Sequence, residues 1–223
     1  MASPVPIDAQ ADGPSANERW LSNAYVEIFG RPADDSGLDF WLGRLATGGD
    51  ERRAAVARTM LFSPEGAGNE VDRAYADLLG RAAEPGGHAF WTSYLQTRPV
   101  TELRTNILAS PERFDGAGSA EAWIVEVYQE LLGRSPDAGG LAYWVGMEAS
   151  GAHHYWIVDA IYQSDESLGG RVQAYYAEIF DRAPTDDERD AGVAVVRIDN
   201  ERVLRAQLLA SDEAFEAFLG SSS

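Results

Sequence analysis

Apolar residues recur along this chain with the spacing of one face of an α-helix, in four successive stretches. The stretches are Trp20, Leu21, Ala24, Tyr25, Ile28 and Phe29; Val71, Ala74, Tyr75, Leu78 and Leu79; Trp123, Ile124, Val127, Tyr128, Leu131 and Leu132; and Val172, Tyr175, Tyr176, Ile179 and Phe180. No segment shows the sustained alternation of apolar and polar residues that marks a half-buried strand. The pattern therefore predicts an all-α protein.

A motif, Tyr-x-x-Ile/Leu-Phe/Leu-Gly-Arg, ends each stretch. It begins at Tyr25, Tyr75 and Tyr128, and it returns at Tyr176 with Asp181 in place of the glycine. The spacing of roughly 50 residues indicates one helical unit used four times, which gives about twelve helices, three in each unit. The expected boundaries are a flexible tail at 1–16, repeats at 17–66, 67–117 and 118–168, a degenerate capping repeat at 169–219, and a tail at 220–223.

Two further marks divide each unit. Gly30, Gly80 and Gly133 stand where the first helix should end, because glycine adopts the left-handed conformation that closes a helix. A turn follows, and then a second helix that carries Phe40-Trp41, Phe90-Trp91 or Tyr143-Trp144. An N-cap pattern recurs at Ser63-Pro64-Glu65, Ser110-Pro111-Glu112, Ser164-Asp165-Glu166 and Ser211-Asp212-Glu213. It predicts a short fourth helix or the start of the next unit.

Composition narrows the classes of partner. The 223 residues carry a formal net charge of −18, so nucleic acids and anionic membranes are poor partners, whereas cations or a basic protein suit this surface. The chain has no lysine and no cysteine, which excludes Schiff-base lysines, disulfides and thiolate metal sites. No apolar run is long enough to insert across a membrane, and the first residues lack the pattern of an intact signal peptide.

The segment from Tyr128 to Trp144 reads Tyr-x-x-Leu-Leu-Gly-Arg-x-Pro-Asp-x-x-Gly-x-x-Tyr-Trp. This pattern, with the Ser-x-Glu mark that follows it, resembles a bacterial domain of unknown function numbered 4214, and more distantly the phycobilisome linker domain. The resemblance extends over most of the chain as tandem copies and is weakest in the fourth unit. It implies an accessory, non-catalytic module of secreted or cell-surface bacterial proteins.

The arginine of each motif copy is the most regular charged position. These residues are Arg31, Arg81, Arg134 and Arg182. A guanidinium beside a helix C-terminus can hold carbonyls or one carboxylate in a bidentate manner. One interpretation pairs each arginine with the glutamate of its Ser-x-Glu mark (Glu65, Glu112, Glu166 and Glu213), and the other makes the arginines a clamp for an anionic or hydroxylated ligand. Because Arg182 persists in the degenerate unit, the pairing is favoured.

Tryptophans offer a second set of candidate ligand contacts. Trp41, Trp91 and Trp144 are either packing residues or platforms on which sugar rings stack, and their aromatic neighbours on the same helix favour packing. Trp20, Trp123 and Trp156 lie on helical stripes and are predicted core residues.

The acidic residues of the turns complete the candidate sites. Asp34, Asp35, Glu84 and Asp137 could cap helices, hold calcium or accept bonds from sugar hydroxyls. Each turn has only one or two carboxylates, so N-capping is favoured, and a calcium ion at Asp34, Asp35 and Asp137 is the alternative. His88 is a further ligand-binding candidate. The adjacent His153 and His154 point in different directions on a helix, so no metal cofactor is expected from them.

No sequence motif of an enzyme is present, neither a nucleophile elbow nor a phosphate-binding or dinucleotide-binding glycine loop, so we expect a protein without catalytic activity. The first hypothesis is a secreted or cell-surface, lectin-like module that binds carbohydrate weakly at one site per intact repeat. It predicts three similar sites and none in the fourth unit. The second hypothesis is a helical scaffold that docks a partner protein or a copy of itself, which predicts an exposed apolar patch.

Overall fold

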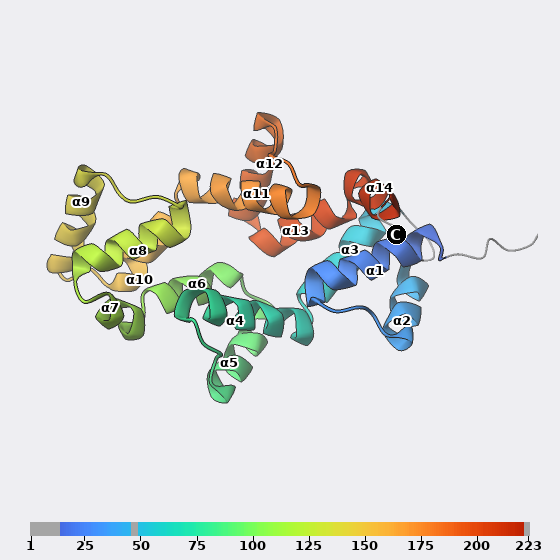
Figure 1. Ribbon diagram of the computed structural model, residues 1–223, viewed down its shortest axis with the longest axis horizontal. Coiled ribbons are helices and arrows are strands. Elements are labelled where there is room, and N and C mark those ends of the chain that lie inside the picture. The colour runs from blue at the N-terminus through green and yellow to red at the C-terminus, as the bar shows by residue number, and fades with distance from the viewer. Residues whose placement is uncertain (1–13, 46–48, 221–223) are drawn as a thin grey trace, which may run out of the picture.

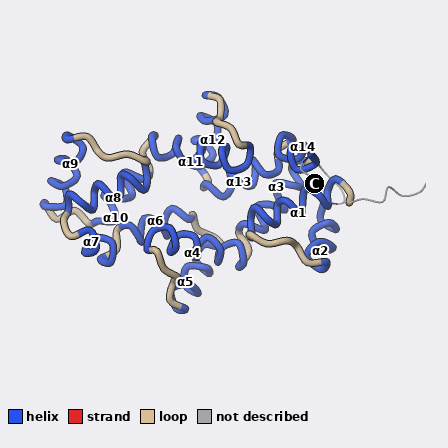
Figure 2. Tube along the Cα trace, viewed as in Figure 1, coloured by secondary structure: helices blue, strands red, loops and turns tan. Residues whose placement is uncertain are grey.

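Within residues 14–45 and 49–220, which the computed structural model describes, the chain forms fourteen α-helices and no strand (Figure 1, Figure 2). The helices are α1 (Ala16–Phe29), α2 (Asp35–Leu45), α3 (Asp50–Leu61), α4 (Pro64–Leu79), α5 (Pro85–Leu95), α6 (Val100–Leu108), α7 (Pro111–Ala117), α8 (Ala120–Leu132), α9 (Ala138–Ala149), α10 (His154–Tyr162), α11 (Asp165–Phe180), α12 (Asp186–Ile198), α13 (Glu201–Ala210) and α14 (Asp212–Gly220). The prediction of an all-α fold is confirmed. Most of the two predicted tails, residues 1–13 and 221–223, lies outside the described residues.

The described residues form two helices more than the twelve expected from the sequence. The additional helices are α7 and α14, and both begin at a Ser-x-Glu mark. At the other two marks the same start leads into the long helices α4 and α11, which run on without a break into the tyrosine motif. Between α7 and α8 the chain is interrupted at Gly118, which has a φ of 80°. One glycine thus divides an element that is continuous elsewhere.

The helices end and begin where the sequence predicted. Gly30, Gly80 and Gly133 follow α1, α4 and α8 in the left-handed conformation, and Asp181 takes the same conformation after α11 with a φ of 53°. The serine of each Ser-x-Glu mark accepts a hydrogen bond from a backbone N–H in the first turn of the helix that it precedes. The distances are 3.1 Å for Ser63, 3.3 Å for Ser110, 3.2 Å for Ser164 and 3.2 Å for Ser211.

The buried residues form two hydrophobic cores. The first core joins the two ends of the chain, because it combines α1, α2 and α3 with α11, α12, α13 and α14. The second core lies within the middle of the chain, from α4 to α10. Trp20 is fully buried in the first core and Trp123 in the second. Helices that are distant in sequence are therefore packed together, and α3 lies against α13.

The same tertiary hydrogen bond occurs in both cores. Trp123 Nε1 donates to the carbonyl of Leu108 at the end of α6, at 2.9 Å. Trp20 Nε1 donates to the carbonyl of Leu209 at the end of α13, at 2.8 Å. The first bond joins neighbouring parts of the chain, whereas the second joins its opposite ends. Helices α1 and α14, from the two ends of the described chain, also lie side by side (Figure 1).

Four helices, α2, α5, α9 and α12, point away from the others (Figure 1). They contribute little to the cores: α5 buries only Leu95, and α9 has no buried residue at all. None of the fourteen helices found in the described ranges has both the length and the apolar character needed to cross a membrane.

Candidate functional site

The motif arginines are paired with the glutamates of the Ser-x-Glu marks, which confirms the structural interpretation of these positions. Nε and Nη2 of each guanidinium donate to the two carboxylate oxygens of one glutamate. The pairs are Arg31–Glu65 at 2.7 and 2.9 Å, Arg81–Glu112 at 2.8 and 2.6 Å, Arg134–Glu166 at 2.6 and 2.7 Å, and Arg182–Glu213 at 2.7 and 2.6 Å. Each pair ties the end of one long helix to the start of a later one.

The remaining donors of these guanidinium groups are also used. In every copy Nη1 donates to the carbonyl of the next residue, and the guanidinium lies over the motif tyrosine, at 5.5 Å from the ring centre of Tyr25 for Arg31 and 5.1 Å from that of Tyr176 for Arg182. The hydrogen bonds that Arg31 donates to Glu65 and Arg182 donates to Glu213 raise the pKa of the two arginines. An anionic ligand would have to displace a bound carboxylate from these arginines.

Two of the turn aspartates act as helix caps, as the sequence favoured. Asp137 Oδ1 accepts from Gly140 N at 2.7 Å at the start of α9. Asp34 Oδ1 accepts from Ser36 Oγ at 2.6 Å and from Gly37 N at 2.8 Å at the start of α2, and these bonds lower the pKa of Asp34.

For the side chains of the other two turn acids, Glu84 and Asp35, the prediction of N-capping was wrong. Glu84 precedes α5 without capping it through its side chain. Its pKa is lowered by its own backbone N–H and by Arg81, which donates to it at 3.2 Å. Asp35 is exposed in the first turn of α2. No group of three or more acidic or histidine side chains that could hold a metal ion occurs in the part of the chain that the structure describes. Calcium at the turns therefore gains no support from this geometry.

The three candidate tryptophans are packed against the cores, as the sequence favoured. Trp41 is only 8% exposed and belongs to the first core, while Trp91 and Trp144 are half-buried against the second. The indole nitrogens donate to motif tyrosines: Trp41 to the Tyr25 hydroxyl at 3.2 Å and Trp144 to the Tyr128 hydroxyl at 2.8 Å. These rings are held in place by the fold and present little surface to a ligand.

The residue before each of these tryptophans is exposed, and the sequence interpretation missed it. Phe40 is 50% exposed, and Phe90 and Tyr143 are each 58% exposed. Consecutive residues of a helix point about 100° apart, so only one ring of each aromatic pair can face the core. The doublets Phe-Trp and Tyr-Trp contained this signal. On α12 the corresponding residue is the exposed Ala191, which is followed by the buried Gly192.

Trp156 was predicted to be a core residue, and this prediction was wrong. Its side chain is 66% exposed on α10. This helix buries Ile157, Val158, Ile161 and Tyr162 instead. Trp156 lies about 100° from Ile157 and about 200° from Val158 around the helix axis, so it cannot share their face.

The histidines occupy separate places. His88 on α5 lies 3.4 Å from Asp72 Oδ1 of α4 through Nε2, and its Nδ1 lies 3.4 Å from the Thr92 hydroxyl. His153 caps α10, where Nδ1 accepts from Tyr155 N at 3.2 Å. His154 stacks on the ring of Phe114, at 4.1 Å between ring centres. His88 shares no contact with His153 or His154, so the three histidines do not form a common site.

The family of the chain follows from its sequence match. Residues 9–70 and 104–170 match a protein family described as a domain of unknown function (DUF4214). Neither the curated proteins nor the solved structures include a match to this chain. The two matched segments together make up more than half of the chain, and each contains one copy of the clamped arginine motif, at Arg31 and Arg134. The chain therefore belongs to the DUF4214 family, which it matches in two tandem segments.

Proposed function

We propose that this protein is a non-catalytic binding module that docks the basic surface of a partner protein through aromatic residues on its projecting helices. The observation that carries the proposal is the exposure of Phe40, Phe90 and Tyr143 at matching positions of α2, α5 and α9. Large aromatic side chains are the commonest energetic centres of protein interfaces. A helix such as α9, which buries no residue of its own, has an apolar surface available for such contacts.

The net charge of −18 supports a basic partner. Complementary charge steers two proteins together and suppresses wrong partners, while a buried aromatic ring supplies most of the affinity. On α2 the two features are adjacent, because the exposed Asp35 and Asp39 share the helix with Phe40. Asp34, Glu84 and Asp137 of the turns have contacts within the fold, whereas the three exposed rings remain accessible to a partner.

The proposal includes a fourfold internal arrangement. The four clamped arginines, the four capped Ser-x-Glu marks and the equivalent bonds of Trp20 and Trp123 support four related units of roughly 50 residues. In this arrangement the fourth unit packs against the first through the Trp20 bond to Leu209. The second unit packs against the third in the same way, through the Trp123 bond to Leu108. The fourth unit is the degenerate one, since α12 carries Ala191 in place of the exposed aromatic residue.

A lectin-like function is the second candidate, and one observation favours it. Exposed rings occur on α2, α5 and α9 and not on α12, which is the distribution expected for one carbohydrate site per intact unit. Their surroundings differ, however: the Arg44 guanidinium lies 3.6 Å from the ring centre of Phe40, and Phe90 stacks on Tyr94. Three sites for one sugar should have similar neighbours, so this candidate comes second. In both functions the secreted or cell-surface location rests on the family resemblance.

Two experiments on the full chain test the proposal. In the first, immobilised protein captures partners from the culture medium of the producing bacterium, and each captured protein is purified and its affinity is measured. We expect a basic protein whose affinity falls at least about tenfold in Phe40→Ala/Phe90→Ala/Tyr143→Ala, since interface aromatics cost more than about 1.4 kcal/mol when truncated. Trp156→Ala removes an equally exposed ring from α10 and serves as the matched control.

In the second experiment labelled protein is applied to a glycan array with calcium and with a chelator. A blank array together with a partner that depends on the three rings supports the docking function. Reproducible glycan binding that the triple variant loses would establish the lectin-like function in its place. A partner that binds the triple variant as well as the parent would refute the role of the three rings.

A further inference from the structure

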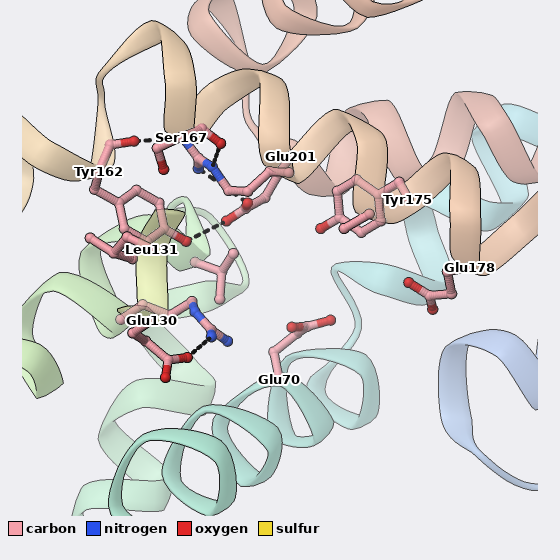
Figure 3. A pocket seen from close by; sticks show the side chains of 12 residues that line it. Glu70, Glu130, Leu131, Tyr162, Ser167, Tyr175, Glu178 and Glu201 are labelled. Carbon is pink, nitrogen blue, oxygen red and sulfur yellow. Dashed lines mark hydrogen bonds and ion pairs between the residues drawn. The ribbon is translucent and has the colours of Figure 1, made fainter. Parts of the chain in front are cut away.

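A cavity of about 190 Å³ is lined by residues of α4, α6, α8, α10, α11 and α13 (Figure 3). Helices from both cores therefore form its walls, and it is open to solvent where Glu130, Ala174 and Glu178 are exposed. Four carboxylates line the cavity against two guanidinium groups: Glu70, Glu130, Glu178 and Glu201 against Arg104 and Arg171. Two of the carboxylates have a closer arginine partner: Glu178 pairs with Arg205 at 2.7 Å and Glu201 with Arg171 at 3.2 Å. The acceptors left for a ligand are therefore those of Glu70 and Glu130.

One wall of this cavity is saturated by internal bonds. Arg171 donates to Glu201 Oε2 at 3.2 Å, to the Tyr162 carbonyl at 2.9 Å and to the Ser167 carbonyl at 3.4 Å. The Tyr162 hydroxyl donates to Glu201 Oε1 at 3.5 Å, and the Arg171 guanidinium lies 4.1 Å from the centre of the Tyr162 ring. Arg171 and Glu201 are thus occupied with each other and with Tyr162.

The opposite wall holds carboxylates whose partners are distant. Glu70 lies 3.5 Å from Arg73 and 3.6 Å from Arg205. Glu130 lies 3.5 Å from Arg104. Charge-assisted hydrogen bonds are usually about 2.7–2.9 Å long, so Glu70 and Glu130 retain acceptor capacity toward the cavity.

A tyrosine hydroxyl points into the same space. Figure 3 shows the Tyr175 hydroxyl directed to the centre of the cavity, between Glu201 and Glu70. Among the residues that the structure describes, none forms a hydrogen bond with this hydroxyl. Burial, and after it the charges of Glu201 and Glu70, raise the pKa of Tyr175, which keeps the hydroxyl neutral. It is therefore free to accept a hydrogen bond from a ligand.

Charge and geometry together select the class of ligand. An anion would meet four carboxylates, and Arg171, one of the two lining arginines, already donates to Glu201 and to the Tyr162 and Ser167 carbonyls. A metal ion needs several oxygen ligands at one point, and no three acidic residues converge in this way within the described ranges. An ammonium group has three donors that separate acceptors can share.

We propose that this cavity binds a small organic cation with primary ammonium groups, of the size of a short alkyl diamine. The ammonium groups donate to Glu70, Glu130 and the Tyr175 hydroxyl, and the alkyl chain packs on Val100 and Leu131, which also line the cavity. The volume corresponds to about six water molecules, and putrescine has about as many non-hydrogen atoms. The site does not involve the projecting aromatic rings, so it is tested independently of partner docking.

Isothermal titration calorimetry on the full chain with three ligands of equal chain length tests this site. They are putrescine, its neutral counterpart butanediol and its anionic counterpart succinate. At about 0.15 M salt, where the Debye length is about 8 Å, weak attraction to the acidic surface as a whole is largely screened. We expect saturable binding of one putrescine and no binding of the other two. Binding of butanediol or succinate with equal affinity would overturn the proposal, and so would the absence of putrescine binding.

Substitutions in the cavity test whether putrescine binds there. Glu70→Gln and Glu130→Gln should each weaken putrescine binding about tenfold or more, because each removes a charge-assisted hydrogen bond, and Tyr175→Phe should weaken it less. Glu121→Gln removes one exposed carboxylate from the same helix as Glu130 and is the matched control. Ala174→Trp, which fills the cavity from its lining, should abolish binding. Unaltered far-UV circular dichroism shows that each variant is folded. Equal effects of Glu121→Gln and Glu70→Gln would show diffuse attraction and contradict a defined site.

Discussion

At the scale of single residues, some recurring residues of this chain stabilise the fold and others remain exposed to solvent. The motif arginine recurs four times with the same contacts, and in each aromatic pair of α2, α5 and α9 the tryptophan packs against a core while the ring before it is exposed. Trp144 donates to Tyr128, whereas Tyr143 is 58% exposed. Adjacent residues of one helix therefore differ in function because their side chains point in different directions.

Truncation of this pair should separate stability from binding. Trp144→Ala should lower the free energy of unfolding by an amount near the lower end of about 3–5 kcal/mol, because the ring is half-buried and its hydrogen bond is lost. Tyr143→Ala should change it by less than about 0.5 kcal/mol. Urea denaturation of both variants measures these values. Similar losses in the two variants would contradict the orientation of the pair.

The stability of the protein should depend on pH through Arg182, which has two carboxylate partners. Arg182 binds Glu213 and also Glu188, at 2.8 and 2.9 Å, and this contact lowers the pKa of Glu188 from 4.5 to about 2. Since the folded pKa is depressed, the stabilisation is present above about pH 4.5 and is lost as the pH falls toward about 2. The effect is reduced by solvent, because the Glu188 side chain is 32% exposed.

Glu188→Gln should therefore lower the denaturation midpoint at neutral pH and reduce its decline on acidification through this range. Urea denaturation at a series of pH values measures both effects. Asp187→Asn removes a charge from the same helix turn and should leave the decline nearly as in the parent. If the two variants gave parallel pH profiles, the Arg182 contact would not be the source of the dependence.

At the scale of elements, the residues that end the helices differ along the chain. Three long helices end at a glycine, while α11 ends at Asp181 with a φ of 53°. A residue with a Cβ is strained in this conformation, though aspartate tolerates it better than most. The extra helix α7 arises in the same way, from the single Gly118 that separates it from α8.

Asp181→Gly should raise the free energy of unfolding by up to about 1 kcal/mol, because it relieves this strain. The reciprocal change, Gly133→Asp, should destabilise by a comparable amount, since Gly133 has a φ of 66°. Thermal denaturation of both variants provides the comparison. A loss of stability in Asp181→Gly would indicate that the aspartate makes a contribution other than closing α11.

At the scale of the whole molecule, a buried arginine connects the two cores. Arg202 on α13 is 1% exposed and donates to the carbonyls of Leu61 at 3.2 Å, of Arg98 at 2.6 Å and of Leu95. Leu61 ends α3 in the first core, whereas Leu95 ends α5 beside the second. Phe62 lies beneath the guanidinium, at 4.0 Å from the ring centre, which completes the enclosure of this charge.

Arg202→Met should destabilise the protein by at least about 2 kcal/mol, because buried carbonyls lose their donor while the volume of the side chain is nearly kept. Urea denaturation followed by tryptophan fluorescence reports on both cores, since Trp20 and Trp123 lie in different ones. Arg113→Met is the control, because Arg113 is half-buried, donates to the Leu78 carbonyl and pairs with the partly exposed Glu126 at 2.9 Å, and does not join the two cores. Equal stability of the parent and Arg202→Met would exclude a connecting role.

The sequence by itself determined the local features of this protein. The helical period, the glycines that end helices, the serine caps and the pairing of Arg31 with Glu65 could all be predicted, because each depends on a short segment or on a position repeated in every unit. The sequence motif repeats the arginine–glutamate pair four times and the glycine three times. The packing of Trp41, Trp91 and Trp144 was predictable for the same reason.

The tertiary structure alone decided which helix covers which apolar face. Periodicity shows that a stripe is apolar, but it does not identify its partner, so the shared core of α1–α3 with α11–α14 could not be read from the chain. The exposure of Trp156 and Phe40 and the cavity around Tyr175 depend on that packing. Burial is a property of the assembled helices, because a side chain leaves water only when another element covers it.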